Sequence, residues 1–207
     1  EVSLNEKIQD ATLIVEAKVT QKQAYWNDAN SSIFTANEIE IYKVFKGQIP
    51  SGTHQIITQG GTVGSDRLVV CPSLQLSVGE IGVFLLESST ANLSVVNGLK
   101  LSPIAERQGF YKYDEISGKA VSPFDYNQTV NQLHTVIQAQ TNQAVTQNIA
   151  YTFSTISFPE SGIAPQITGI SPTSLNGGVG DVLTITGSGF DILLPTSKVQ
   201  LYNSDLG

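Results

Sequence analysis

Residues 12–47 read TLIVEAKVTQ, KQAYWNDANSS and IFTANEIEIYKVFKG, and this stretch decides the fold. Between Leu13 and Val19 every odd-numbered side chain is apolar, the period of a β-strand with one buried face. Ile39 and Ile41 alternate with glutamates in the same way. The polar residues 21–32 between the two runs are expected to form a loop. The stretch therefore predicts the first hairpin of a curled antiparallel sheet.

Shorter strand-like runs continue along the first two thirds of the chain. We expect strands at residues 54–58, 66–71, 81–86, 93–96, 99–101, 110–113 and 119–121. Asn97-Gly98 is the strongest short hairpin signal in the sequence. A capping box at Ser3 predicts a short helix before the first strand. A second helix is expected from Asp125, with its buried face formed by Tyr126, Val130, Leu133 and Ile137.

Composition excludes several classes of function. The 207 residues carry a formal net charge of −7, so no overall basic surface is available to bind phosphates or anionic lipid. We therefore expect neither nucleic-acid binding nor membrane insertion, and no run approaches the roughly 18 apolar residues of a membrane span. The single cysteine, Cys71, follows two valines and is expected to be a buried small hydrophobe. A reactive thiol would need a nearby cation, for which Arg67 is the candidate.

Catalytic residues are not indicated. His54 and His134 lie about 80 positions apart, without the spacing of a zinc site, and His134 is expected on a solvated helix face. Glu38 and Glu40 alternate with isoleucines, as on the wet outer face of a sheet. The glycine-rich residues 60–64 do not open a helix, which favours a bend over a phosphate loop. We expect no catalytic residue, no metal and no cofactor.

Contact residues are predicted in two loops. Exposed Tyr and Trp side chains are favoured in interfaces because they offer a large area at little cost in entropy. In one interpretation Trp26 is exposed at the tip of the first hairpin and contacts a partner. In the alternative, Trp26 folds back and covers the open end of the barrel that the curled sheet would form. The predicted binding residues are Tyr25, Trp26, Asn27, Asp28, Gly60 and Gly61.

The first 120 residues contain four motifs in order: IVEAKV (14–19), YKVFKG (42–47), ITQGGTVG (57–64) and LSVGEIGVFLL (76–86). This order resembles the netrin-like, or tissue-inhibitor-of-metalloproteinase-like, OB-fold domains. The resemblance implies an OB-like antiparallel barrel with two flanking helices over residues 1–140. It also implies a place at the front of a secreted bacterial multi-domain protein. Some proteins of that group carry a metalloprotease domain and a type IX secretion tail. The animal inhibitors chelate zinc through an N-terminal cysteine, whereas this chain starts with Glu1, so that mechanism is not implied.

A second resemblance follows a polar linker expected at residues 141–164. The segments PQITGISPTS (165–174) and GGVGDVLTITGSGF (177–190) resemble the start of an IPT/TIG domain, an immunoglobulin-like sandwich. Such a sandwich needs roughly 80 to 100 residues, but only 43 remain from Pro165. Residues 165–207 are therefore expected to be the truncated N-terminal half of that domain.

The expected function is recognition or scaffolding, without catalysis, within a larger secreted or cell-surface bacterial protein whose signal peptide has been removed. Its partner would be a protein or a surface glycan. One alternative is an accessory region that regulates a zinc metalloprotease encoded downstream. Another is a carbohydrate-binding module, suggested by the aromatic residues Tyr25 and Trp26 in an Asn-rich loop.

Overall fold

The computed structural model describes residues 1–155, 166–171 and 184–188. The chain divides into two compact units, Glu1–Ile156 and Ser157–Gly207. The described residues are mainly β, as the sequence predicts. The elements of the first unit are α1 (Leu4–Asp10), β1 (Leu13–Trp26), β2 (Ile33–Lys46), β3 (His54–Gln59), β4 (Gly61–Val63), β5 (Asp66–Leu68), β6 (Ile81–Ser88), β7 (Leu99–Pro103), the 3-10 helix η1 (Glu106–Gly109), β8 (Phe110–Asp114), β9 (Lys119–Val121), α2 (Val130–Thr141) and β10 (Thr146–Gln147).

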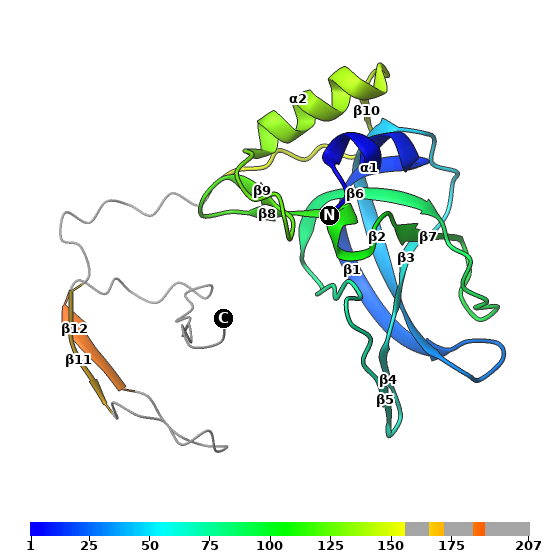
Figure 1. Cartoon of the computed structure of the whole chain (residues 1–207), viewed down its shortest axis with the longest axis horizontal. Coiled ribbons are helices and arrows are strands. Elements are labelled where there is room, and N and C mark those ends of the chain that lie inside the picture. The colour runs from blue at the N-terminus through cyan, green and yellow to red at the C-terminus, as the bar shows by residue number, and fades with distance from the viewer. Residues whose placement is uncertain (156–165, 172–183, 189–207) are drawn as a thin grey trace. The chain divides into compact units, whose positions relative to one another are not determined.

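Five strands of the first unit close into a ring. The sheet order runs β1-β2-β3-β7-β6, and β6 pairs in turn with β1. β3 and β7 are parallel, and the other pairs of the ring are antiparallel. β8 and β9 extend the sheet from β6, and the β4–β5 hairpin projects at the end of the unit opposite the helices (Figure 1).

Both faces of β1 are buried in its first half, where the sequence predicts one. The odd-numbered side chains from Leu13 to Val19 point into the ring, where they join a core that includes Phe84 and Leu86. The even-numbered Ile14 lies on the outside, in a second core with Phe45 and Val83. α1, α2 and β8 supply the cover for this outer face. The burial of both faces makes β1 the strand around which the unit is packed.

The helices confirm one prediction and correct another. α1 has the predicted capping box, in which Ser3 Oγ accepts from the Glu6 N–H. α2 begins at Val130 rather than at Asp125, because a second capping box at Thr129 fixes its start. Tyr126 consequently lies outside the helix and is exposed. Neither helix has the length and the apolar character that crossing a membrane would require, within the residues described.

Three strand predictions need correction. Residues 21–26 belong to β1 instead of a loop, because they pair with residues 33–38 of β2 although their side chains are polar. The strand expected at 66–71 ends at Leu68. Residues 93–96 form a turn, and Asn97-Gly98 is not a hairpin. Leu93 and Val96 instead pack on the outside of the ring, so burial determines their conformation more than the local turn signal does.

The first unit extends beyond the boundary predicted at residue 140. β10 pairs with β2, and the N–H of Asn148 donates to the carbonyl of Tyr42 at 2.8 Å. The ring of Tyr151 stacks on that of Tyr42, with centroids 4.3 Å apart. The described part of the predicted linker is thus packed on the ring of strands, and we call residues 142–155 the strap.

The second unit is described over two strands, β11 (Gln166–Ser171) and β12 (Thr184–Ser188). They pair antiparallel, and Thr186 Oγ1 donates to the carbonyl of Gly169 at 3.2 Å. Both strands fall where the sequence predicts the first two strands of the immunoglobulin-like half-domain. The remainder of that prediction lies outside the described residues.

The packing of β6 generates a stability prediction. Gly82 lies between its strand neighbours β1 and β8, and a Cβ there would overlap the carbonyl of Tyr111. Gly82→Ala should therefore lower the free energy of unfolding by about 1 to 3 kcal/mol or more. Denaturant unfolding measures this loss. Ser88→Ala, at an exposed position of the same strand, should change it by less than about 0.5 kcal/mol. Equal effects of the two substitutions would contradict the close packing at Gly82.

Candidate functional site

The predicted contact loop is fastened to the rest of the unit. Tyr25 and Trp26 end β1 and are half-buried. Asn27 Oδ1 accepts from the N–H groups of Ser31 and Ser32, at 2.8 and 3.1 Å. Asp28 accepts both the N–H and the Oγ–H of Ser94, at 2.8 and 2.6 Å, and these hydrogen bonds hold its pKa below the ordinary value. The side chains of Asn27 and Asp28 are therefore already hydrogen-bonded within the chain.

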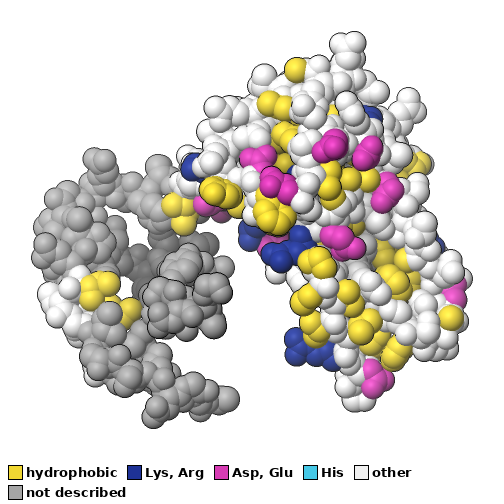
Figure 2. Space-filling model, viewed as in Figure 1, with side chains coloured by type: hydrophobic (Ala, Val, Ile, Leu, Met, Phe, Trp, Pro, Cys, Tyr) yellow, Lys and Arg dark blue, Asp and Glu magenta, His cyan; other side chains and the backbone are white. Residues whose placement is uncertain are grey.

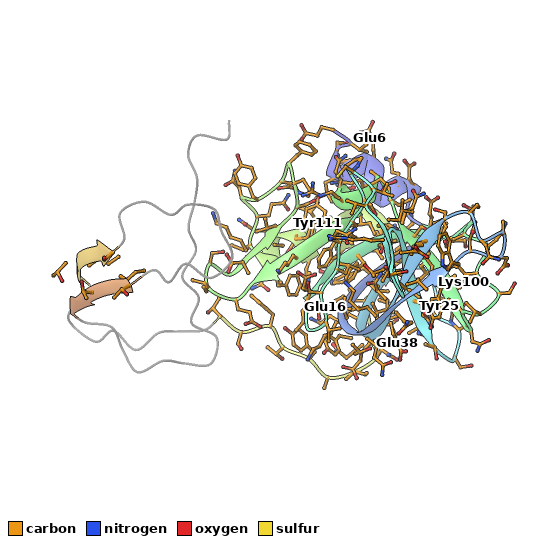
Figure 3. All side chains as sticks on the ribbon, turned by 90° about the horizontal axis from the view of Figure 1, so that it is seen from below. Glu6, Glu16, Tyr25, Glu38, Lys100 and Tyr111 are labelled. Carbon is orange, nitrogen blue, oxygen red and sulfur yellow. The ribbon has the colours of Figure 1, made fainter. Side chains whose placement is uncertain are left out.

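The loop is held in place by its contact with the segment 89–98. It folds over the outer face of β2 and β3, where Leu93 is 1% exposed and packs with Ala36 and Ile57. Tyr25 packs against the same cluster, and Lys100 Nζ donates to the Leu93 carbonyl at 3.0 Å. Figure 3 shows Tyr25 and Lys100 close together on one side of the unit, with Tyr111 away from them. We call residues 89–98 the cover, because they lie over this face of the ring.

Gly60 and Gly61 serve as the predicted bend. Gly61 has φ +141°, and a Cβ at this position would lie 2.6 Å from Thr35 Oγ1. Thr35 Oγ1 in turn donates to the Gly60 carbonyl at 2.7 Å. The two glycines thus allow the chain to leave β3 in close contact with β1 and β2. Gly61 also lies in the wall of a large groove.

This groove is an open cavity of about 1160 Å³ on the surface of the first unit. Residues 67–75, which comprise the end of β5 and the segment after it, form one wall. A second wall includes Phe110 and Lys112 of β8, Val121 of β9, and Tyr126. Figure 2 shows Lys and Arg side chains gathered with apolar ones along one side of this unit.

Cations are concentrated in the groove. Lys22, Arg67, Arg107 and Lys112 line it, which are four of the 11 Lys and Arg residues of the chain, but only Glu80 of the 18 Asp and Glu residues does. Lys112 Nζ pairs with Glu80 at 2.9 Å, and Lys22 Nζ donates to the Leu76 carbonyl at 2.7 Å. Arg67 and Arg107 are exposed and form no ion pair within the described residues. An acidic chain thus contains a locally basic site.

The groove also has an apolar side. Val69 is 65% exposed and Tyr126 is 59% exposed, and both line the groove. Cys71 lies in the same wall and is exposed, so the prediction of a buried cysteine is wrong. The reason is that β5 ends at Leu68, which leaves the run Val69-Val70-Cys71 in a surface segment rather than in a strand. Exposed apolar and cationic groups on one surface suit a ligand that carries both acidic and aliphatic groups.

A buried polar contact holds the wall that carries Tyr126. Lys7 Nζ donates to the hydroxyl of Tyr111 at 2.8 Å, and that hydroxyl donates to Asp125 Oδ2 at 3.3 Å. Burial, and then the charge of Asp125, raise the pKa of Tyr111, while burial lowers the pKa of Lys7. The backbone of Asp125 also exchanges two hydrogen bonds with that of Ser122. The position of Tyr126 is therefore set by α1 and β8.

The clearest ionisable cluster of the unit lies away from the groove. Glu16 of β1 is fully buried, and its carboxylate contacts Lys43 Nζ at 3.0 Å (Oε1) and 3.3 Å (Oε2). Its Oε2 accepts from the hydroxyl of Tyr113 at 2.7 Å and lies 3.1 Å from His134 Nε2. His134 therefore faces the interior, and the predicted solvated position is wrong. Figure 3 shows Glu16 among the packed side chains of the unit.

The geometry fixes where the protons of this cluster lie. His134 Nε2 is also 2.6 Å from the oxygen of Tyr113, which donates its own proton to Glu16. Nε2 thus faces two acceptors and carries a proton. Burial by itself raises the pKa of Glu16, but the hydrogen bonds from His134, Tyr113 and Lys43 outweigh it and give a net lowering. Burial, and then the charge of Glu16, raise the pKa of Tyr113.

This cluster lies within the packed interior, away from both cavities. None of its four residues lines the groove or the smaller cavity of about 370 Å³ beside the cover. Phe153 of the strap packs edge-on against Tyr113, with ring centroids 4.9 Å apart. The described residues also contain no group of three or more His, Cys, Asp and Glu side chains placed to hold a metal ion. The groove is therefore the better candidate for a functional site.

Comparison of the chain with protein-family models, with curated proteins and with solved structures gives no match.

The Glu16 cluster predicts a pH dependence of stability. A carboxyl group whose pKa is lower in the folded state stabilises the fold above its ordinary pKa, and this contribution is lost at lower pH. We expect the free energy of unfolding to fall as the pH drops below about 4.5. Glu16→Gln should lower stability by about 1 to 3 kcal/mol at pH 7 and make the acid dependence shallower.

Denaturant unfolding at a series of pH values measures both effects. Glu115→Gln makes the same change at an exposed position and should leave the unfolding curves close to those of the unaltered protein. An unchanged acid dependence in Glu16→Gln would show that the buried carboxylate does not contribute to it.

Proposed function

We propose that the first unit is a non-catalytic recognition module that binds an acidic partner protein in the basic groove. The observation that carries this proposal is the concentration of four cationic side chains, with one acidic side chain, around an open cavity of a chain with net charge −7. A local positive potential on an acidic protein attracts anionic groups and speeds their association. In this proposal, Arg67 and Arg107 are the main contacts, since both are exposed and neither forms an ion pair within the described residues.

The proposal includes an OB-like barrel, and the closed ring of five strands supports it. OB barrels bind ligands on the face of their second and third strands and through the adjoining loops. Here the cover occupies the face of β2 and β3, and Asp28 ties the first of these loops to it. Recognition at another surface follows, and the groove is a surface of sufficient size.

The setting of the module is also part of the proposal. The resemblances of residues 14–86 and 165–190 support a place in a larger secreted or cell-surface bacterial protein. The pair β11 and β12 supports an immunoglobulin-like second unit, because its strands coincide with the two segments that carry the IPT/TIG resemblance. A protein partner is favoured over a nucleic acid because the exposed apolar side chains of Val69 and Tyr126 line the same groove and suit a ligand that carries aliphatic groups.

Fluorescence anisotropy with defined probes tests the proposal. A labelled peptide rich in Glu and Val should bind saturably and more weakly as salt is added, because screening reduces its attraction to the groove. A Lys-rich peptide, a neutral oligosaccharide and a single-stranded oligonucleotide should bind at least tenfold more weakly. Equal or tighter binding of the oligosaccharide or the oligonucleotide would overturn the choice of a protein partner.

Matched charge reversals locate the binding. Arg67→Glu combined with Arg107→Glu should weaken binding of the acidic peptide at least tenfold. Lys18→Glu combined with Lys119→Glu changes the net charge equally but alters residues that do not line the groove, and should have a much smaller effect. Equal losses in the two double variants would show that net charge, rather than the groove, determines binding.

A further inference from the structure

The smaller cavity of about 370 Å³ adjoins the basic groove. It is lined by residues from β2, β3, β6, β7, η1 and the cover. Ser73 and Leu74 line both cavities, and both residues are buried. Ser73 is also fixed in place, because its Oγ donates to the Gln59 carbonyl at 2.7 Å. The two cavities therefore lie on either side of the same two residues.

The 3-10 helix η1 reaches both cavities with consecutive residues. Glu106 lines the smaller cavity and Arg107 lines the groove, and both side chains are exposed. The Cα atoms of neighbouring residues are about 3.8 Å apart. The turn before them is closed by the N–H of Gln108, which donates to the Ala105 carbonyl at 3.1 Å. Negative charge in one cavity thus begins one residue away from positive charge in the other.

The smaller cavity has the opposite charge to the groove. Its described lining includes Glu87 and Glu106 but no Lys, Arg or His. Both glutamates are exposed, and neither forms an ion pair within the described residues. Its volume is near the lower end of the roughly 300–1,000 Å³ of ligand pockets, so it suits a single side chain of a partner. An ammonium or guanidinium group matches its charge.

We propose that the groove and the smaller cavity form one binding surface, on which the partner places acidic side chains in the groove and one Lys or Arg side chain in the smaller cavity. This inference rests on the proposed function and adds the order of charges in the partner. Complementary charges fix the register of a bound segment. Because Glu106 and Arg107 are adjacent, the cation follows or precedes the acidic stretch directly, within about three residues.

The position of the cation in the ligand provides the first test. Three capped peptides contain four Glu and one Lys, with the Lys at the N-terminal end, in the middle or at the C-terminal end. Their equal net charge makes the long-range attraction to the groove equal. In competition with the labelled acidic peptide at pH 7, at least one end peptide should bind fivefold or more tightly than the middle peptide, whose Lys would lie among the cations of the groove. Equal affinities of the three would overturn the inference.

Removing the charge of the smaller cavity provides the second test. Glu87→Gln with Glu106→Gln should bring the tightest end peptide to within about twofold of the middle peptide. Asp10→Asn with Glu115→Gln removes the same charge at exposed positions that line neither cavity, and should keep the fivefold difference. All four residues are exposed, so both variants should fold, and their unfolding temperatures verify this. A difference that persists in the first variant would contradict binding of the cation there.

Acetylation of the peptide Lys separates a local contact from net charge. It makes the tightest end peptide more negative, which by itself should strengthen attraction to the basic groove. We expect the opposite, a loss of at least fivefold with the unaltered protein, and no loss with Glu87→Gln combined with Glu106→Gln. Equal or tighter binding of the acetylated peptide to the unaltered protein would show that the smaller cavity does not bind the cation.

Failure of this inference can be distinguished from failure of the proposed function. If acidic peptides bind, and Arg67→Glu with Arg107→Glu removes that binding, the groove is a recognition site whatever the effect of the Lys. Insensitivity to the position and the acetylation of the Lys would then overturn only the role of the smaller cavity. If no acidic peptide binds, or if the arginine reversals have no effect, the proposed function itself fails.

Discussion

The first half of β1 has neither a free edge nor a free face, and this constraint organises the unit. From Ile14 to Lys18 the strand pairs with β2 on one side and β6 on the other. Its odd-numbered side chains fill the ring, and its even-numbered ones lie beneath the helices. Glu16 is therefore carried into the interior, where an unpaired carboxylate would cost several kcal/mol. Lys43, Tyr113 and His134 offset that cost and thereby tie β2, β8 and α2 to the strand.

The ring could be predicted from the alternation in β1 and β2 and from the apolar run of β6, but the second buried face of β1 could not be recognised, because it carries Glu16 and Lys18. Glu16 reads as a solvent-facing position, since the residues that compensate it lie in distant parts of the sequence. Ile14 and Phe45 are the residues from which this second face could have been inferred, because apolar residues on the side assigned to water indicate a second packed layer. The start of α2 at Val130 could also have been predicted, since Thr129 and Gln132 have the spacing of a capping box.

The site was harder to predict than the fold, for two physical reasons. Asn97-Gly98 is a local turn signal, but burial of Leu93 and Val96 gains more free energy than a short hairpin would, and the segment becomes the cover. The groove joins residues from β1, from the segment after β5 and from both sides of β8. Each of these pieces has an ordinary composition, so the excess of positive charge arises only when folding brings Lys22, Arg67 and Arg107 together. Gly61 is the predicted contact residue that does lie in this groove.

The strap adds to the length of chain that is needed to cover the aromatic side chains on the outside of the ring. Tyr151 shields one face of the Tyr42 ring, and Phe153 shields Tyr113 beside the buried carboxylate. A fragment that stopped at residue 140 would expose these rings to water as an apolar surface, which favours aggregation and lowers solubility. Transplanting the first unit into another protein therefore requires the sequence through Thr155, with any engineered spacer attached beyond it.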